Sequence, residues 1–389
     1  MRSCRECKIS EIGKIVSGAT PKTSLPENYG GSIAWITPAD LSGYQEKYIS
    51  RGARNITQAG YDSCSTQLMP AGTVLFSSRA PIGYVAIAQN PICTNQGFKS
   101  IVPNESVDSE YLFYQLKYLR KQIQEMGSGT TFKEISAQTL GEVRIVVPSI
   151  PEQKRIVARI EELFSELDTG VETLQKTKQQ LAVYRQAVLN DAFSQISQYI
   201  PFGTITDSRL GKMLDKDKNT GTPRKYLRNI NVRWFSFDLL DLLEMRIEDT
   251  EVDKYSVIKG DLVICEGGEP GRCAVWDAEE PIFYQKALHR VRFADGSNPK
   301  FYMYYLWFAA QTGKLKAYFT GMGIKHLTGQ SLVKVPVPTV NRIEQDDIVS
   351  SIECRLSMCD SIEKTVDTAL QQAEAMRQSI LKQAFEGRL

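Results

Sequence analysis

The chain has 389 residues, of which 42% are hydrophobic and 24% are charged, and its formal net charge is +2. This length fits two or three domains with a sizeable core, and the composition excludes a wholly disordered chain. The most apolar stretch, Phe301 to Ala310, is about half of what a membrane span needs. Because charged residues stand at the N-terminus in place of an apolar leader, we expect a cytoplasmic protein.

Residues 1–150 alternate short β-type segments with turn residues. These segments begin at Trp35, Thr73, Tyr84 and Val143, and Gly, Pro and Asn separate them. The stretch from Asp108 to Glu125 has the apolar spacing of one helix. We therefore predict an α+β globule with a twisted, mostly antiparallel sheet.

A long helix is predicted next, over residues 151–195, because Pro151-Glu152 suits a helix start and apolar residues recur every seven positions. A second globule of the same class follows at 196–338, and a second long helix at 339–389. The two helices repeat each other. An ungapped shift of 192 residues aligns Glu152-Gln153 with Glu344-Gln345 and gives 16 identities in 42 positions. The chain is thus a duplicated unit.

Apolar repeats of seven residues over this length are typical of coiled coils, so we predict that the two helices pair with each other as an antiparallel coiled coil. The alternative is that each helix packs only on its own globule. The predicted pairing positions are Ile160, Leu167, Leu174, Leu181, Val188, Ile352, Val366 and Ile380.

The sequence offers little for catalysis or metal binding. Cys4 and Cys7 form one CxxC without a second pair, and eight scattered cysteines suit reduced thiols rather than a disulfide framework. Two histidines leave little material for nucleophilic catalysis. Neither a phosphate-binding GxxxxGK[ST] loop nor the Asn/Asp-Pro-Pro-aromatic motif of an amino-methyltransferase occurs. We expect no catalytic residue, no metal and no cofactor on this chain.

Charge separates the globules from the helices. Residues 1–150 hold 15 Lys and Arg against 12 Asp and Glu, and residues 196–338 hold 20 against 17, so each globule carries +3. The helical segments carry −1, from 6 against 7, and −3, from 6 against 9. Positive globules suit contact with phosphates and acidic helices suit a protein partner, although a solvated surface gives similar values.

Several loops combine glycine with cations, hydroxyls or carboxylates. Arginine and lysine can bind guanine edges, carboxylates can accept from cytosine, and hydroxyls can hold phosphates. The alternative for each single residue is a solvated loop. The predicted DNA-binding residues are Lys22, Thr23, Ser77, Ser78, Arg79, Thr130, Thr131, Lys133, Lys218, Arg224, Lys225, Arg228, Glu266, Glu269, Arg272 and Lys325.

Variable globules alternating with similar helices resemble the specificity subunits of type I restriction-modification enzymes. The stretches that carry the resemblance are Gly30-Gly-Ser-Ile-Ala-Trp-Ile-Thr-Pro-Ala-Asp-Leu, Gly127-Ser-Gly-Thr-Thr-Phe-Lys-Glu-Ile, Val147-Pro-Ser-Ile-Pro-Glu-Gln-Lys-Arg-Ile-Val and the Arg-Gln-x-x-Leu-x-x-Ala-Phe endings at Arg185 and Arg377.

The resemblance implies that each globule reads one half of a split, asymmetric DNA site, while the helices fix the spacer. It also implies two docked methyltransferase subunits and two restriction subunits, with S-adenosylmethionine, ATP and Mg²⁺ bound on those partners. Two other hypotheses stay open. A coiled-coil adaptor would not bind duplex DNA, and a DNA methyltransferase or nuclease with unrecognised motifs would bind a methyl donor or metal by itself.

Overall fold

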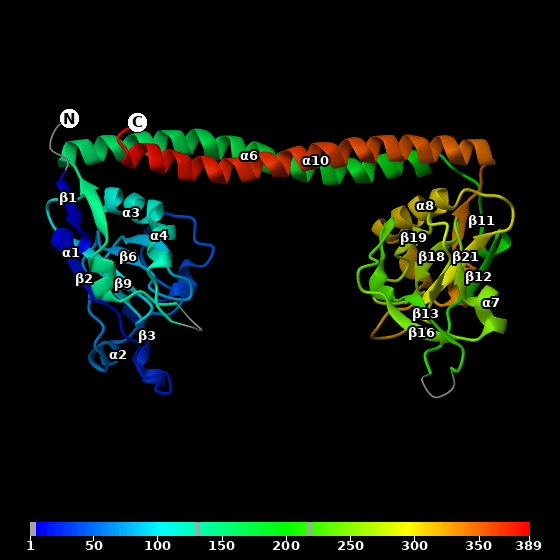
Figure 1. Cartoon of the computed structure of the whole chain (residues 1–389), viewed down its shortest axis with the longest axis horizontal. Coiled ribbons are helices and arrows are strands. Elements are labelled where there is room, and N and C mark those ends of the chain that lie inside the picture. Colours follow the sequence, from blue (N-terminus) through cyan, green and yellow to red (C-terminus); the bar gives the residue numbers. More distant parts are fainter. Residues whose placement is uncertain (1–4, 130–132, 216–218) are drawn as a thin grey trace. The chain divides into compact units, whose positions relative to one another are not determined.

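The computed structural model describes residues 5–129, 133–215 and 219–389. The chain forms two compact units, unit 1 (Met1–Leu174 with Thr368–Leu389) and unit 2 (Gln175–Asp367). Two long helices, α6 (Ile150–Ser194) and α10 (Arg342–Phe385), each contribute one half to each unit (Figure 1). No helix in the described part of the chain has the length and apolar character of a membrane span.

The globule of unit 1 is built on a five-stranded sheet of order β2-β9-β6-β7-β5, in which the β5–β7 pair is parallel and the other pairs are antiparallel. The smaller pairs are β1–β10 and β4–β8. The strands are β1 (Arg5–Lys8), β2 (Gly13–Ser17), β3 (Tyr29–Ile33), β4 (Trp35–Ile36), β5 (Tyr48–Ile49), β6 (Val74–Phe76), β7 (Val85–Ala88), β8 (Cys93–Thr94), β9 (Lys99–Pro103) and β10 (Arg144–Val147). The helices are α1 (Ile9–Ile12), α2 (Gln58–Asp62), α3 (Ser109–Tyr118), α4 (Arg120–Glu125) and α5 (Ala137–Gly141).

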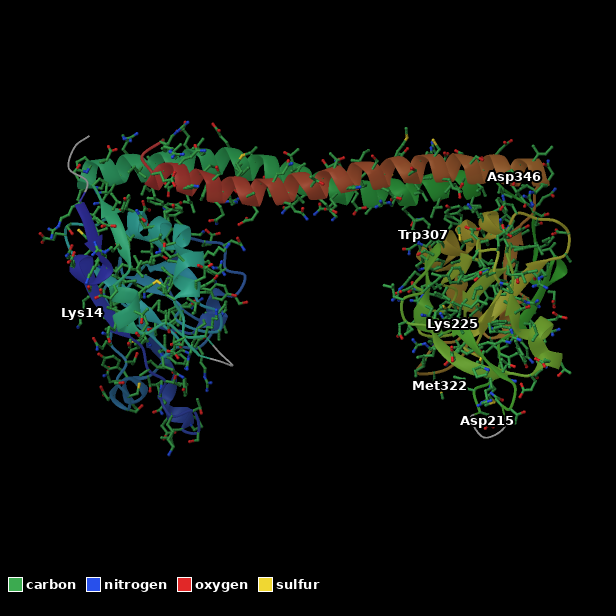
Figure 2. The ribbon with its side chains drawn as sticks, viewed as in Figure 1. Lys14, Asp215, Lys225, Trp307, Met322 and Asp346 are labelled. Carbon is green, nitrogen blue, oxygen red and sulfur yellow. The ribbon has the colours of Figure 1, made fainter. Side chains whose placement is uncertain are left out.

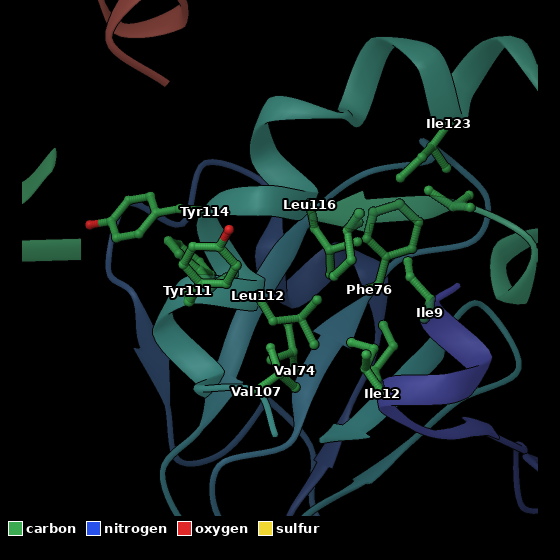
Figure 3. Packing of buried hydrophobic residues seen from close by; sticks show 14 of the residues in the cluster. Ile9, Ile12, Val74, Phe76, Val107, Tyr111, Leu112, Tyr114, Leu116 and Ile123 are labelled. Atoms are coloured by element: carbon green, nitrogen blue, oxygen red, sulfur yellow. The ribbon is translucent and has the colours of Figure 1, made fainter. Parts of the chain in front are cut away.

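Helix α3 covers one face of this sheet. The carboxylate of Asp108 caps it by accepting from the backbone N–H groups of Glu110 and Tyr111. Its apolar side packs on residues of β6 and α1 in a fully buried core (Figure 3). The single helix expected over Asp108–Glu125 is wrong in one detail, because the chain breaks at Leu119 and resumes as α4.

Unit 2 repeats the design with two four-stranded sheets, β12-β21-β18-β19 and β16-β13-β20-β17. All their pairs are antiparallel except β13–β20. The strands are β11 (Tyr199–Pro201), β12 (Thr206–Leu210), β13 (Thr222–Leu227), β14 (Val232–Arg233), β15 (Ser236–Phe237), β16 (Leu243–Ile247), β17 (Ser256–Val257), β18 (Leu262–Cys265), β19 (Cys273–Val275), β20 (Ile282–Tyr284), β21 (Leu288–Phe293) and β22 (Pro336–Pro338). The helices are α7 (Val252–Tyr255), α8 (Pro299–Gln311) and α9 (Gly329–Leu332). The α+β prediction is therefore confirmed.

Helices α6 and α10 pack against each other in an antiparallel direction. In unit 2, Lys178 pairs with Asp367 at 2.8 Å, and further along α6 Asp191 pairs with Arg355 at 2.8 Å. The partner's number falls as the number along α6 rises. In unit 1, Arg377 of α10 pairs with Asp168 of α6.

The predicted pairing positions differ in burial. Six are buried, namely Ile160, Leu181, Val188, Ile352, Val366 and Ile380, whereas Leu167 and Leu174 are only partly buried. Ile160, Val188 and Ile352 also belong to the globule cores, so the helix ends pack on globules as well as on the other helix. Leu181, Val366 and Ile380 lie outside those cores and are nevertheless buried, which supports pairing of the two helices.

The repeated Glu-Gln and Ala-Phe motifs have a packing role. Buried Gln153 accepts from the backbone N–H of Asp108 at 2.8 Å, and buried Gln345 accepts from that of Asn298 at 2.7 Å. Each glutamine thus ties the start of a long helix to the start of α3 or α8. Phe385 packs on Tyr111 of α3, and Phe193 packs on Phe301 of α8, both with ring centroids 5.5 Å apart.

Candidate nucleic-acid interface

In unit 1 three loops meet at one place, which we call junction 1: residues 77–84, residues 95–97, and residues 128–129 with 133–135. The first loop is closed by a hydrogen bond from the N–H of Ser77 to the carbonyl of Tyr84, at 2.9 Å. Ser78 then joins the other two loops, since its N–H donates to Gly97 at 2.7 Å and its carbonyl accepts from Ile135 at 3.0 Å. Backbone hydrogen bonds therefore fix three sequence-distant loops together.

Unit 2 contains the same arrangement, junction 2: residues 265–272, 285–287 and 320–327. The N–H of Cys265 donates to Arg272 at 2.7 Å, and Glu266 joins the other loops through Ala287 at 3.0 Å and Leu327 at 2.7 Å. Lys133 and Lys325 occupy the same position in the third loop, two residues before the joined Ile135 and Leu327. The two junctions share a backbone frame and differ in their side chains.

Junction 1 presents cations and amide groups around two neighbouring pockets. Arg79, Asn95 and Tyr84 line a pocket of about 470 Å³, and Lys133 lines another of about 520 Å³ together with Lys121. Arg79 lies 3.6 Å from Glu134, which is also 3.5 Å from Lys99. One carboxylate thus faces two cations, so Arg79 keeps bonding capacity for a ligand.

The structure corrects the prediction for Ser77 and Ser78. Both side chains are fully buried. The hydroxyl of Ser77 donates to the carbonyl of Pro81 and accepts from the N–H of Tyr84, both at 2.7 Å. The Ser77 hydroxyl therefore holds the turn from inside, Ser78 contributes through its backbone, and neither buried hydroxyl is exposed to a phosphate.

In junction 2 the predicted charged residues bind one another. Arg272 is largely buried and donates to Glu269 at 2.8 Å and to the carbonyl of Asn229 at 3.0 Å. Glu269 also accepts from the indole N–H of Trp234 at 2.7 Å. Arg272 and Glu269 therefore hold the loop in the structure. The prediction that these two residues read bases is not supported.

Arg228 and Arg224 are similarly engaged. Arg228 donates to the carboxylate of Asp241 at 2.6 Å, and Arg224 lies over the ring of Phe283 at 5.3 Å. Lys225, the next residue on β13, is exposed. Glu266 is half-buried and contributes its backbone to junction 2.

The remaining predicted residues divide by position. Lys22, Thr23 and Lys325 are exposed, and the ammonium group of Lys325 donates to the carbonyl of Gly321 at 2.8 Å. Thr130, Thr131 and Lys218 lie outside the described residues. Met322, Lys225 and Asp215 lie on the side of unit 2 away from Asp346 of α10 (Figure 2). These three residues therefore lie on the side of unit 2 away from the labelled end of α10.

Sequence reasoning missed four residues at the junctions. Met322 and Ile324 are 104% and 74% exposed at the tip of the third loop of junction 2. Asn95 lines the Arg79 pocket, and Lys286 is exposed in the second loop of junction 2. Glycines at 321 and 323, on both sides of Met322, are a signal that could have indicated an exposed tip.

Buried His289 supports the third loop of junction 2, and its ring Nε2 lies 3.0 Å from the carbonyl of Leu327. Burial lowers the pKa of His289, so the folded chain keeps the ring neutral while the unfolded chain takes up a proton below about pH 6.5. We expect the free energy of unfolding to fall as pH drops through that range. Thermal unfolding at about pH 7.5 and about pH 5.5 checks this, and His289→Asn should flatten the difference. An unchanged difference in the variant would contradict it.

In the described ranges, no group of three or more His, Cys, Asp or Glu side chains could hold a metal ion. Cys4, half of the CxxC pair, lies outside those ranges, and Cys7 is a buried free thiol.

The two units repeat one loop junction on paired helices, and comparison with known proteins shows which proteins the chain is similar to. The family model described as the type I restriction modification DNA specificity domain matches residues 2–180. The type I restriction enzyme MjaIX specificity subunit of Methanocaldococcus jannaschii is 37% identical over 243 residues, covering 58% of this chain and 55% of that protein. The EcoKI specificity subunit of Escherichia coli K12 is 23% identical over 339 residues, covering 80% and 73%.

Among solved structures, a chain from work on complex assembly and conformational transition of the type I R-M system has a TM-score of 0.80 at 16% identity, covering 100% of this chain and 99% of that one. This likeness concerns the fold. Residues 2–180 of this chain are thus similar to the type I restriction modification DNA specificity domain, and longer stretches are similar to specificity subunits of type I restriction enzymes. Its match spans about half the length of the M. jannaschii relative.

Proposed function

We propose that this chain is the non-catalytic, sequence-reading subunit of a type I restriction-modification complex, in which each unit reads one half of a bipartite DNA site. The observation that carries the proposal is the duplicated junction. One backbone frame is built twice, and its exposed side chains differ between the units. A frame used twice suits one kind of ligand, and different side chains suit different sequences of that ligand.

The chemistry of each junction favours a different half-site. Around one pocket, Arg79 has the donors that pair with a guanine edge, and Asn95, whose Oδ1 accepts from the N–H of Gly97 at 2.9 Å, still has amide donors for an acceptor such as a purine N7. Junction 2 instead exposes Met322 and Ile324, which suit contact with thymine methyl groups, beside the phosphate-binding candidates Lys325 and Lys286. The full site is therefore asymmetric.

The long helices have two roles in this proposal. They fix the separation of the half-sites, and their exposed surface docks two methyltransferase subunits, joined by two restriction subunits in the cytoplasm. Val183, Ile343 and Met358 are exposed apolar residues on the helices of unit 2 that suit such docking. S-adenosylmethionine, ATP and Mg²⁺ bind to the partners, which perform the chemistry.

Replacing Arg79 by Ala tests base reading. We expect a loss of about 1–3 kcal/mol for the specific site and relaxed preference at one base pair of the first half-site. The fold should persist because Glu134 keeps Lys99 as a partner. The measurement is binding of the assembled complex to a panel of single-base variants.

Two matched variants complete that test. Lys133→Ala should weaken binding to all DNA sequences alike. It should also reduce the slope of log affinity against log salt by about one, because one phosphate contact is lost. Lys14→Ala, on the edge strand β2, should leave DNA binding as in the parent. If Arg79→Ala weakened every sequence equally, the assignment of Arg79 to a base would be wrong. Salt-independent binding of the parent would contradict DNA recognition itself.

Lengthening both helices tests the spacer. Seven residues inserted at matched places in α6 and α10 add about 10 Å of helix rise, which corresponds to about three base pairs. We expect both half-sites to be retained with a wider gap, as read by methylation mapping in cells. An unchanged gap would show that the helices do not set it.

A further inference from the structure

Unit 1 contains a polar pocket of about 670 Å³ that none of the DNA-reading residues above explains. It lies between α3, α4, the loop before β7 and the halves of α6 and α10 that belong to this unit. Three cations line it, Lys117, Arg120 and Arg377, against two carboxylates, Asp168 and Glu374.

The two carboxylates serve Arg377. This guanidinium pairs with Asp168, lies 4.0 Å from Glu374 and lies over the ring of Phe164 at 5.2 Å. Its charge is therefore compensated by groups that hold it in place, and it forms the wall of the pocket.

Lys117 and Arg120 are held differently. Lys117 lies 5.0 Å from the ring of Phe113, and Arg120 lies 5.9 Å from the ring of Tyr84. In the described part of the chain neither has a carboxylate within salt-bridge distance. Desolvation, followed by repulsion from Arg377 and Arg120, lowers the pKa of Lys117, and Glu374 offsets only part of this effect. An anion between the two side chains would relieve the repulsion.

The pocket adjoins junction 1. Tyr84 lines both this pocket and the pocket of Arg79. Arg120 packs so closely on the first loop that a Cβ added at Gly83 would lie 2.7 Å from its Cγ. An anion held by Lys117 and Arg120 would thus be next to the bases that Arg79 reads.

Unit 2 lacks these cations. Aligning Tyr111 of α3 with Phe301 of α8 places Trp307 at the position of Lys117 and Ala310 at that of Arg120. Trp307 packs on Phe235 with ring centroids 4.7 Å apart. The second unit therefore fills with an aromatic contact the place where the first unit has two cations.

We propose that Lys117 and Arg120 form an anion site that binds a backbone phosphate of the DNA strand flanking the first half-site. The inference rests on the proposed function. The site anchors unit 1 without reading sequence, so the protein contacts more of the backbone beside one half-site than beside the other.

The test uses the complete complex with Lys117→Gln/Arg120→Gln in this chain. Specific binding should weaken about tenfold at moderate salt, and the slope of log affinity against log salt should flatten by about one, because one phosphate contact is lost. The methylated sequence should stay unchanged. A single methylphosphonate beside the first half-site removes one backbone charge from the DNA. It should weaken binding by the parent complex by the same factor, and it should not change binding by the variant complex.

The control is Lys14→Gln/Arg144→Gln, which removes two charges from β2 and the exposed β1–β10 pair and should keep the parent's slope. Thermal unfolding of both variants is the check that they fold like the parent. If the parent binds DNA specifically but the pocket variant keeps the parent's slope, the inference is wrong while the proposed function stands. A third outcome is that inorganic phosphate raises the thermal stability of the parent but not of the variant, while DNA binding is the same for both. In that case the pocket binds free phosphate and the proposed DNA contact is wrong. Absence of specific DNA binding in the parent would overturn the proposed function.

Discussion

Replacing Leu181 by Asp should destabilise unit 2 by about 3–5 kcal/mol and abolish modification of DNA in cells. Leu181 is 8% exposed. Lys178 and Arg185 lie one helical turn to either side of it, and both reach carboxylates of α10. An aspartate at this position would place a carboxylate where a buried leucine packs, and it could be neutralised only by drawing Lys178 or Arg185 away from their carboxylate partners on α10.

The neighbouring Ala182 provides the matched control, because it is exposed on the same helix. Ala182→Asp should change the free energy of unfolding by about 0.5 kcal/mol or less. Chemical denaturation of the purified chain and size-exclusion analysis with the proposed methyltransferase partner measure the two effects. If Leu181→Asp unfolds and assembles like Ala182→Asp, the paired helices do not contribute to stability or assembly.

Exchanging residues 196–338 for the corresponding globule of a similar specificity subunit should change one half-site completely and leave the other as it was. The expectation follows from the separate junctions, since the backbone bonds of junction 2, including those from Gln285 to Leu227 and from Lys286 to Lys212, all lie within residues 196–338. The packing of Phe193 and Gln345 on α8 must be kept, so the incoming globule needs an aromatic residue at position 301. A change in both half-sites would show that the globules do not read DNA independently.

The sequence predicted the duplication because its signal is local and repeated. Glu152-Gln153 and Glu344-Gln345 align without gaps, and the seven-residue spacing indicates paired helices. The reason for the motif could not be predicted. Gln153 hydrogen-bonds Asp108, 45 residues away, and one sequence gives no signal for such a contact.

The candidate site was predicted only in part, because one polar residue in a loop can either contact a ligand or hold the loop from inside. Ser77 follows a buried strand and is polar, which suits both a DNA contact and a turn held from inside. The choice depends on the path of Pro81 and Tyr84, which only the fold determines. Glu269 and Arg272 are three residues apart, a spacing that could have indicated their ion pair.

The most direct measurement of the central claim, that two units read two half-sites, is methylome sequencing of cells with and without this gene. We expect a methylated motif that appears only with the gene. It should consist of two unlike specified halves, separated by unspecified bases of constant number, and the exchange of residues 196–338 should rewrite one half alone. A palindromic motif, a continuous motif without a gap, or a methylome that does not depend on the gene would contradict the account.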